Sequence, residues 1–394
     1  MIIRQLTTEH FDERIALSEF AFQYQMPPER REQERERFRP EECWGAFDES
    51  GRLLSGLYLL PLEAWVQGRK LRMGGVAGVA TWPEARRHGC VKQLLIHTLG
   101  IMREQGQTIS MLAPFSFPFY RKFGWEMTVT RKQYEIEKSH FPKRAEASGT
   151  VERVAKDTAI VAPVYARYAS RYTGPLVRDE EWWDRRRWNK PGLVALYRNG
   201  NGEAEGYICY RVENRIMTVE EWVELSDEAR RALWNFVLNH DSMIDKMTVT
   251  MPIDDELPFL LPEPRIKQEL KAYFMSRIVD APALVGLYPF QEGPDGERLT
   301  LRLSDAEAPW NDGLFEVVFG SGGEAVMKRL AGSEVPEADQ ADASCDIQTL
   351  AAMLLGDRRP SWLASVGRLS GREETIAALD RRIPVRSTYL MDFF

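Results

Sequence analysis

The spacing of apolar residues divides the first 140 residues into alternating strands and helices. Apolar runs of strand length cover residues 2–6, 44–47, 53–63, 72–81, 110–112 and 128–136. Apolar residues three or four positions apart predict helices at residues 8–25, with Phe20 and Phe22 on the apolar face, and at 91–102. The charged segment 28–41 is typical of a solvated helix. This order predicts a complete α/β unit built on a mixed sheet.

The next segment repeats the same order of elements. Residues 139–149 are polar and contain Pro142, which predicts a linker. Strands are then expected at 150–155, 193–197, 206–212, 216–222 and 247–251, and helices at 159–171, 180–188 and 227–239. The turn Gly200-Asn201-Gly202 joins two of these strands as a hairpin. The repetition predicts a duplicated domain.

A third pattern begins near Ala281, with strands expected at 299–303 and 313–319 and helices at 347–355, 361–367 and 373–379. The sequence therefore predicts three domains, at residues 1–140, 150–282 and 283–394. The last six residues are Tyr389-Leu390-Met391-Asp392-Phe393-Phe394. Because chain ends normally fray in water, this apolar end predicts a terminus docked against the rest of the protein.

The turn between the strand 72–81 and the helix 91–102 carries residues suited to a phosphate: Arg86, Arg87, His88 and Gly89. The first turn of a helix has unpaired N–H groups and a dipole that favours negative charge, and a glycine lets a ligand approach the backbone. The segment therefore predicts a pyrophosphate cradle, although it lacks the Gly-Lys-Ser/Thr of a P-loop. A basic helix start packed on a sheet is the alternative. The corresponding turn of the second segment, residues 225–228, has acids instead and predicts no such cradle.

Composition narrows the class of protein. The net charge of −7 and a pI near 5.6 argue against a nucleic-acid binder, which usually has a basic excess. The apolar runs are too short for a transmembrane helix, and the first residues lack the apolar core of a signal peptide. Four scattered cysteines predict neither a disulfide framework nor a zinc site: Cys43, Cys90, Cys209 and Cys345. We therefore expect no metal and a reducing, cytoplasmic setting.

Tyr120 is the best candidate for a general acid. It follows a strand and a turn with Pro114 and Pro118, which favours a loop that holds the ring still. A phenol with a pKa of about 10 can protonate a leaving thiolate. The alternative is an aromatic core residue with a satisfied hydroxyl.

Two motifs resemble those of GNAT-family acetyltransferases. Arg86-x-x-Gly89-x-Val91 is similar to their R/Q-x-x-G-x-G/A signature, with Val91 as a departure, and Phe119-Tyr120-Arg121-Lys122-Phe123-Gly124-Trp125 is similar to their F-Y-x-K-x-G-F/W segment. The resemblance implies that acetyl-CoA binds along the residues Val79, Ala80, Thr81, Arg86, Arg87, His88, Gly89, Cys90 and Val91. It also implies that the N–H of Val79 polarises the thioester carbonyl and that an amine attacks directly. Cys90 is then expected to be a small buried helix residue rather than a nucleophile.

An amine acceptor arrives protonated, so a base is needed. His88 belongs to the cradle, which leaves the α-carboxylate of Phe394 at the docked chain end as the candidate base. Hydrophobic packing of the tail is the alternative.

The whole chain resembles the Eis-type (enhanced intracellular survival) acetyltransferases. Beyond the two motifs, the likeness rests on the pair Leu233-Trp234, on residues 241–243, 257–261 and 277–284, and on the aromatic last residue. It implies tandem GNAT folds, the second without a cradle, followed by a sterol-carrier-like α+β domain whose C-terminus enters the first domain's active site. It further implies a hexamer that acetylates polycationic amines, with Tyr120 as acid and the Phe394 carboxylate as base.

The acceptor pocket is where this chain departs most from that family, because its residues are aromatic here: Phe20, Phe22, Tyr24 and Phe393. Two other functions stay open: an acyl-CoA or lipid sensor or carrier, and an acetyltransferase of proteins or peptides. The segment 182–188, rich in Trp and Arg, is either an interface or ordinary core.

Overall fold

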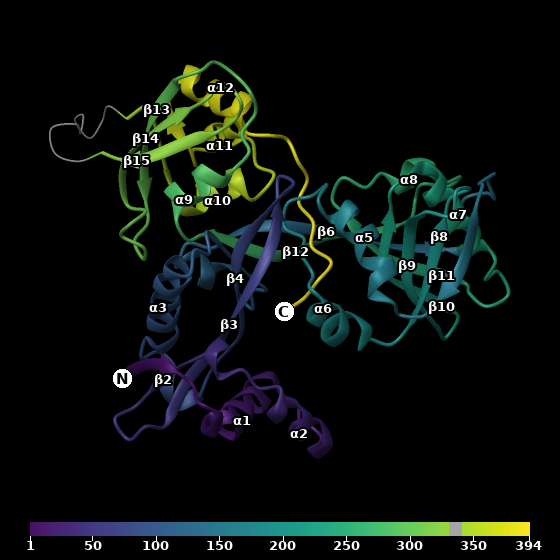
Figure 1. Cartoon of the computed structure of the whole chain (residues 1–394), viewed down its shortest axis with the longest axis horizontal. Helices are drawn as coiled ribbons and strands as arrows, with labels where there is room; N and C mark the ends of the chain where they lie inside the picture. The colour runs from purple at the N-terminus through teal and green to yellow at the C-terminus, as the bar shows by residue number, and fades with distance from the viewer. Residues whose placement is uncertain (331–340) are drawn as a thin grey trace.

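The computed structural model describes residues 1–330 and 341–394. We call residues 1–140, 150–280 and 281–394 the first, second and third units. Figure 1 shows the first unit at the lower left, the second at the right and the third at the upper left. The yellow end of the chain runs between them and stops beside α6 (Glu180–Trp182).

The first unit follows the predicted order of elements. Its strands are β1 (Ile2–Gln5), β2 (Cys43–Phe47), β3 (Leu53–Val66), β4 (Arg69–Thr81), β5 (Ile109–Leu112) and β6 (Glu126–Glu137). Its helices are α1 (Phe11–Phe22), α2 (Pro28–Glu36), α3 (Cys90–Glu104) and α4 (Phe117–Arg121), with short 3-10 turns at Thr8–His10, Pro40–Glu42, Pro83–Ala85 and Lys138–His140. Helix α1 ends earlier than predicted, because Gln23 adopts the left-handed conformation with φ 55°.

The second unit repeats this order. It contains β7 (Thr150–Val154), α5 (Thr158–Ala169), α6, a π-helical turn at Trp183–Trp188, β8 (Leu193–Arg198), β9 (Ala204–Glu213), β10 (Ile216–Glu224), α7 (Asp227–Leu238), β11 (Lys246–Pro252), α8 (Leu257–Leu260) and β12 (Lys267–Ile278). The predicted hairpin is confirmed, since β8 pairs antiparallel with β9. Trp182 and Trp183 are buried, which favours the core interpretation of that segment over the interface.

The two units share one sheet of twelve strands, in the order β1-β2-β3-β4-β5-β12-β6-β11-β10-β9-β8-β7. The prediction that the first 140 residues form a complete unit is therefore wrong, because β12 fills the place between β5 and β6. Met275 of β12 pairs with Leu112 on one side and with Met127 on the other. In return, residues 131–137 of β6 pair with β11. Each unit thus satisfies its strand edges with a strand of the other.

The third unit is an α+β layer structure. Its strands form a separate sheet in the order β15-β14-β13-β16-β17: β13 (Glu297–Ser304), β14 (Gly313–Phe319), β15 (Ala325–Arg329), β16 (Ala343–Asp346) and β17 (Ser370–Gly371). Its helices are α9 (Ala281–Leu287), α10 (Ile347–Leu354), α11 (Pro360–Ser365) and α12 (Glu373–Arg382). Its core is continuous with one face of the large sheet, where Met73 and Ile278 belong to the same apolar cluster as Leu301. This packing fixes where the chain end leaves the third unit.

Candidate functional site

The sheet of the first unit opens between β4 and β5. The two strands pair in parallel from Met73 with Ile109 to Val76 with Leu112. Strand β4 then continues to Thr81, whereas β5 ends at Leu112. Along residues 77–81, the edge of β4 that faces away from β3 has no strand partner in the described part of the chain. Backbone groups of this edge are free to bind a ligand.

A β-bulge shapes this free edge. Opposite Gly56 and Tyr58 of β3, strand β4 has one extra residue between Ala77 and Ala80, and Gly78 there has φ 55°. A Cβ on Gly78 would lie 2.8 Å from the ring of Tyr58, so a larger residue would clash as well as strain the backbone.

Arg14 of α1 holds the bulge from behind. Its side chain is fully buried, and its Nη2 donates to the Gly78 carbonyl oxygen at 2.7 Å. The guanidinium also lies over the ring of Tyr58, 4.4 Å from the centroid. The carbonyl of Gly78 and the N–H of Val79 belong to one peptide group, so a cationic donor on the carbonyl polarises that N–H. Arg14 is not among the residues predicted from the sequence, although a charged residue between Phe11 and Ile15 on the buried side of α1 is a signal for such a role.

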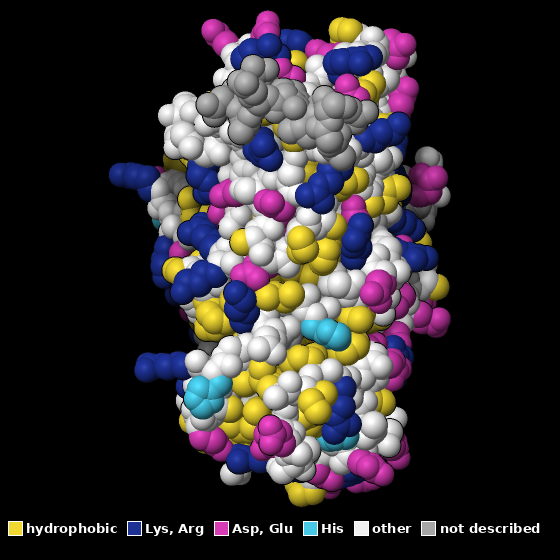
Figure 2. Space-filling model, turned by 90° about the vertical axis from the view of Figure 1, so that its left-hand side faces the viewer, with side chains coloured by type: hydrophobic (Ala, Val, Ile, Leu, Met, Phe, Trp, Pro, Cys, Tyr) yellow, Lys and Arg dark blue, Asp and Glu magenta, His cyan; other side chains and the backbone are white. Residues whose placement is uncertain are grey.

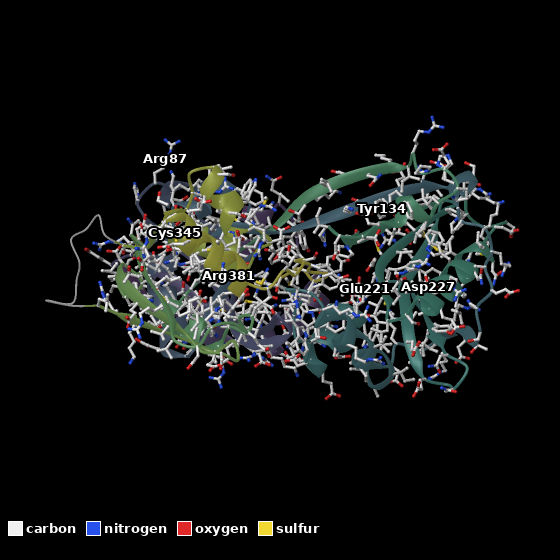
Figure 3. All side chains as sticks on the ribbon, turned by 90° about the horizontal axis from the view of Figure 1, so that it is seen from above. Arg87, Tyr134, Glu221, Asp227, Cys345 and Arg381 are labelled. Carbon is white, nitrogen blue, oxygen red and sulfur yellow. The ribbon has the colours of Figure 1, made fainter. Side chains whose placement is uncertain are left out.

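The residues of the predicted cradle are exposed at the start of α3. Gly89 is the N-cap with φ 79°, Arg87 has φ 68°, and no acidic residue lies in the first turn of the helix. A Cβ placed on Gly89 would meet no atom within 4 Å, so the space before the helix is open. Arg87 points away from the fold (Figure 3). Figure 2 shows Lys and Arg side chains spread among hydrophobic ones on the side of the molecule that carries α3. This turn fits a phosphate group.

The corresponding helix of the second unit is closed to phosphate. The Oγ of Ser226 accepts from the N–H of Ala229 at 3.2 Å, and Asp227 and Glu228 lie in the first turn of α7. Asp227 is labelled in Figure 3, in the second unit and far from Arg87. The acids repel an anion at the place where the first unit has arginines.

Tyr120 lies on a short helix and not on a loop as predicted. Helix α4 forms because Ser116 caps it, accepting from the N–H of Phe119, and because a proline in the first turn loses no hydrogen bond. The Tyr120 side chain is 2% exposed and packs against Phe115, Phe119 and Trp125. Burial raises the pKa of its phenol above the usual value of 10. The group is therefore protonated at neutral pH. Cys90, also buried, lies in the same apolar cluster, as expected for a small buried helix residue.

Tyr120 and the chain end belong to apolar clusters on opposite faces of the sheet. Val76 and Leu112, the last pair of β4 and β5, pack in the same apolar cluster as Tyr120. The preceding pair, Gly75 and Met111, faces the other side. There the ring of Phe394 packs so closely that a Cβ on Gly75 would lie 3.0 Å from it. The apolar cluster that contains Tyr120 and the ring of Phe394 thus lie on opposite faces of the sheet beside the last pairs of β4 and β5.

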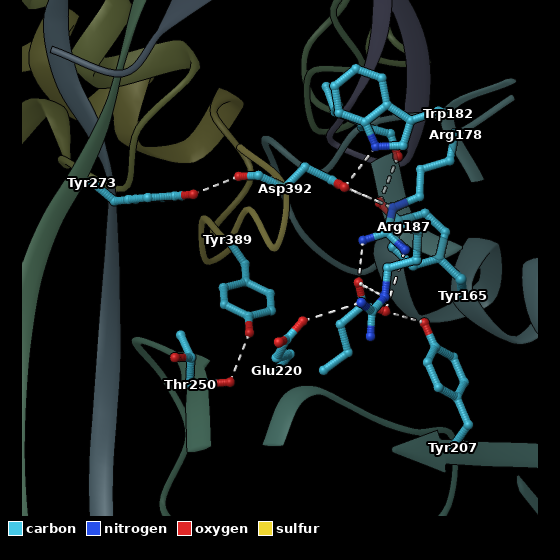
Figure 4. Close-up of polar contacts among 12 residues, drawn as sticks. Tyr165, Arg178, Trp182, Arg187, Tyr207, Glu220, Thr250, Tyr273, Tyr389 and Asp392 are labelled. Carbon is cyan, nitrogen blue, oxygen red and sulfur yellow. Dashed lines mark hydrogen bonds and ion pairs between the residues drawn. The ribbon is translucent and has the colours of Figure 1, made fainter. Parts of the chain in front are cut away.

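The chain end is docked, as the sequence predicted, and Phe394 is buried. The backbone of Thr173 bonds to the tail on both sides, donating to Ser387 and accepting from Tyr389 at 3.0 Å each. The hydroxyl of Tyr389 donates to the Thr250 carbonyl at 3.0 Å, and that of Tyr273 to the Asp392 carbonyl at 2.7 Å (Figure 4).

A buried network of charges anchors the tail to the second unit (Figure 4). Arg178 donates its Nε to both carboxylate oxygens of Asp392, at 3.0 and 3.1 Å, and its Nη2 to Glu221 at 2.6 Å. Glu221 also lies 3.0 Å from the Nε of Arg187. The indole of Trp182 donates to Asp392 at 2.8 Å. These residues come from distant parts of the chain, so no local pattern in the sequence predicts that they meet.

The network makes the docked tail sensitive to acid. Burial by itself would raise the pKa of Glu221, but Arg178 and Arg187 lower it to about 2. A carboxylate whose pKa falls on folding stabilises the protein above its unfolded pKa of about 4.3 and loses that contribution as the pH falls toward 2. We expect urea unfolding to show a loss of about 3 kcal/mol from this group between pH 6 and pH 2. Glu221→Gln should show a correspondingly flatter pH dependence, with the exposed Glu152→Gln as control, and parallel curves for all three proteins would contradict this.

The four aromatic residues predicted to line the acceptor pocket are exposed but divided between two places. Phe20, Phe22 and Tyr24 lie at the end of α1, where Phe20 packs 5.2 Å from Trp82 beside the cradle. Phe393 lies at the chain end, with its ring 6.2 Å from that of Phe274. The exposure of Phe20 and Phe22 also corrects the predicted helix face, which counted them as core.

The described residues were also compared with the requirements of a metal site and of a membrane-spanning helix. Within residues 1–330 and 341–394, no group of three or more His, Cys, Asp or Glu side chains is arranged to hold a metal ion. In that same part of the chain, no helix is long and apolar enough to cross a membrane.

Comparison with known proteins agrees with this architecture. Models of the acetyltransferase (GNAT) domain match residues 2–128 and 174–278, and a sterol carrier protein domain model matches residues 281–391. A crystal structure from Enterococcus faecalis V583, described as a probable N-acyltransferase, has 28% identity and a TM-score of 0.91, with 100% of this chain and 99% of that chain covered.

Curated sequence relatives include proteins named as N-acetyltransferases. An uncharacterised N-acetyltransferase of Streptomyces griseus is 26% identical over 60% of this chain, and the match spans 64% of that relative's length. The N-acetyltransferase Eis of Mycobacterium tuberculosis is 22% identical over 81% of each chain. Two GNAT domains followed by a sterol carrier domain define the class of protein. The chain belongs to the Eis-type family of GNAT N-acetyltransferases.

Proposed function

We propose that this protein transfers the acetyl group of acetyl-CoA to small polycationic amines, of the aminoglycoside or polyamine kind. The observation that carries the proposal is the parting of β4 and β5, which has the apolar cluster of Tyr120 on one face of the sheet and the ring of Phe394 on the other. The pyrophosphate of acetyl-CoA would bind at Arg86–Val91, where the helix start is open and free of acids. The free edge at Val79, Ala80 and Thr81 would hold the arm that carries the thioester.

In this mechanism the amine attacks the thioester carbonyl carbon directly. The N–H of Val79 donates to the carbonyl oxygen as negative charge develops there, and Arg14 strengthens that donor through the Gly78 carbonyl. The carboxylate of Phe394 accepts a proton from the attacking amine. When the C–S bond breaks, Tyr120 donates its proton to the CoA thiolate. The exposed aromatic rings of Phe20, Phe22, Tyr24 and Phe393 would contact the cationic acceptor.

We further propose a cytoplasmic enzyme that assembles as a hexamer. Four free, buried cysteines fit a reducing compartment, and the hexamer follows from the likeness to the family.

An acceptor panel tests the function. We expect release of CoA thiol from acetyl-CoA with aminoglycosides or linear polyamines, slower release with lysine peptides, and none without acceptor. Arg86→Ala should raise the KM for acetyl-CoA with little change in kcat, because it removes a phosphate contact and no reacting group. Release of CoA thiol with lysine peptides alone would instead indicate that the protein acetylates proteins or peptides. Binding of acetyl-CoA without turnover on any acceptor would favour a sensor or carrier.

A further inference from the structure

The second unit has an opening like that of the first. Strands β10 and β11 pair in parallel from Ile216 with Lys246 to Val219 with Val249, and β10 then continues to Glu224 paired with β9 but no longer with β11. A bulge between Val219 and Glu221 marks the point at which β10 parts from β11. The duplicated fold has therefore kept the split strands and the bulge, although α7 has lost the phosphate cradle.

A cavity of about 350 Å³ lies at this split. Trp234 and Met247 line it from the apolar cluster on the α7 face of the sheet, and Tyr168 lines it from the cluster on the α5 face. Residues from both faces of the sheet thus line one cavity beside the split. Its size lies within the range of small-molecule pockets.

The wall of this cavity combines aromatic rings with carboxylates. The rings of Trp222 and Trp234 lie 5.3 Å apart, and those of Tyr168 and Tyr172 lie 5.2 Å apart. Glu224 and Asp255 are both lining residues. The Glu224 carboxylate accepts from the indole of Trp222 at 2.6 Å, and that of Asp255 accepts from the N–H of Leu257 at 3.0 Å.

No cation of the described chain forms a salt bridge with either carboxylate. The two arginines in the cavity wall bind other groups. Arg171 donates to the main-chain oxygens of Glu224 and Leu225, and Arg230 forms a salt bridge with Asp227. Burial raises the pKa of Glu224 to about 7 and also raises that of Asp255. Both residues are partly exposed, but a carboxylate that is largely withdrawn from water and has no salt-bridge partner is costly, and a cationic ligand would relieve that cost.

We propose that the split between β10 and β11 is a second amine-binding site, which takes an aliphatic amine with a protonated primary amino group and does not acetylate it. The aromatic faces attract a cation, and the carboxylates need N–H donors, which a quaternary ammonium group lacks. Acetyl-CoA has no place there, because Ser226, Asp227 and Glu228 close the start of α7 to its pyrophosphate. The site is independent of the acetylation proposed for the first unit.

Calorimetric titration of the full-length protein with putrescine tests the site. We expect the double variant Glu224→Gln, Asp255→Asn to weaken binding at one class of sites by about 10- to 100-fold, the usual loss for a hydrogen bond to a charged group. Glu213→Gln, an exposed carboxylate on β9, is the matched control and should bind as the wild type does. Acetylation rates of the double variant should not change. Unchanged putrescine binding in a folded double variant would overturn the proposal.

A second measurement uses the unaltered protein. Glu224 must be ionised to hold an ammonium group, and the charged or titratable groups that face it are Arg171, Arg230, Asp227, Asp255 and Tyr168. With a pKa of about 7, Glu224 is mostly protonated at pH 6 and mostly ionised at pH 8. We expect affinity for putrescine at this site to be about tenfold lower at pH 6, and the difference to vanish in Glu224→Gln. Equal affinity at both pH values would contradict the site.

Discussion

Tyr120→Phe should lower kcat for acetyl transfer by about 100- to 10 000-fold, the usual contribution of a positioned general acid. The leaving CoA thiolate needs a proton, and the buried phenol is held protonated because burial raises its pKa. The substitution keeps the ring, so its packing against Phe119 and Trp125 stays in place. Steady-state kinetics should therefore show a loss in kcat, with a KM for acetyl-CoA close to that of the wild type.

The control for this experiment is Tyr197→Phe in the second unit. Tyr197 is also fully buried, and its hydroxyl donates to the Ser148 carbonyl at 3.2 Å, away from the opening between β4 and β5. We expect this variant to keep its rate, even if it loses some stability. A Tyr120→Phe enzyme with full activity would remove Tyr120 from the mechanism and return it to the core.

Adding two residues, Gly-Ser, after Phe394 should reduce turnover by about 100-fold or more, the scale of a lost general base. The extension converts the terminal carboxylate into an amide and moves the charge away. It must also fit beside a ring that already packs against Gly75, Phe274 and Trp182. Binding of acetyl-CoA should persist, because the predicted cradle is at the start of α3, whereas the ring of Phe394 packs against Gly75 of β4.

The matched control carries the same two residues ahead of Met1, which is exposed. That protein should have normal rates. Removing Phe394 provides a second variant, in which the carboxylate persists on Phe393 but retreats from Gly75, and we expect it to be impaired as well. Normal turnover with the C-terminal extension would exclude the carboxylate as base and leave the buried chain end with a purely structural role.

Local patterns in the sequence predicted much of the fold. Short-range periodicity and turn residues predict β3, β4, α3 and the hairpin of β8 and β9. These signals can be recognised in the sequence without knowing any tertiary contact. The repeated order of elements predicted the duplication, and the two motifs around Gly89 and Tyr120 predicted the family. The aromatic end of the chain correctly predicted docking, because an exposed apolar terminus is unfavourable.

Only the tertiary structure decided how these parts meet. Strand β12 lies between β5 and β6 because the edges of both strands need a hydrogen-bonding partner. The local sequence of residues 267–278 does not indicate which strands β12 pairs with. The hydrogen bonds of Arg178 to Asp392 and of Arg14 to Gly78 join residues that are far apart in sequence. Local periodicity therefore cannot predict these bonds. The cavity of the second unit arises from the parting of two strands. Sequence determined the elements and their chemistry, while long-range pairing and burial decided which residues share a site.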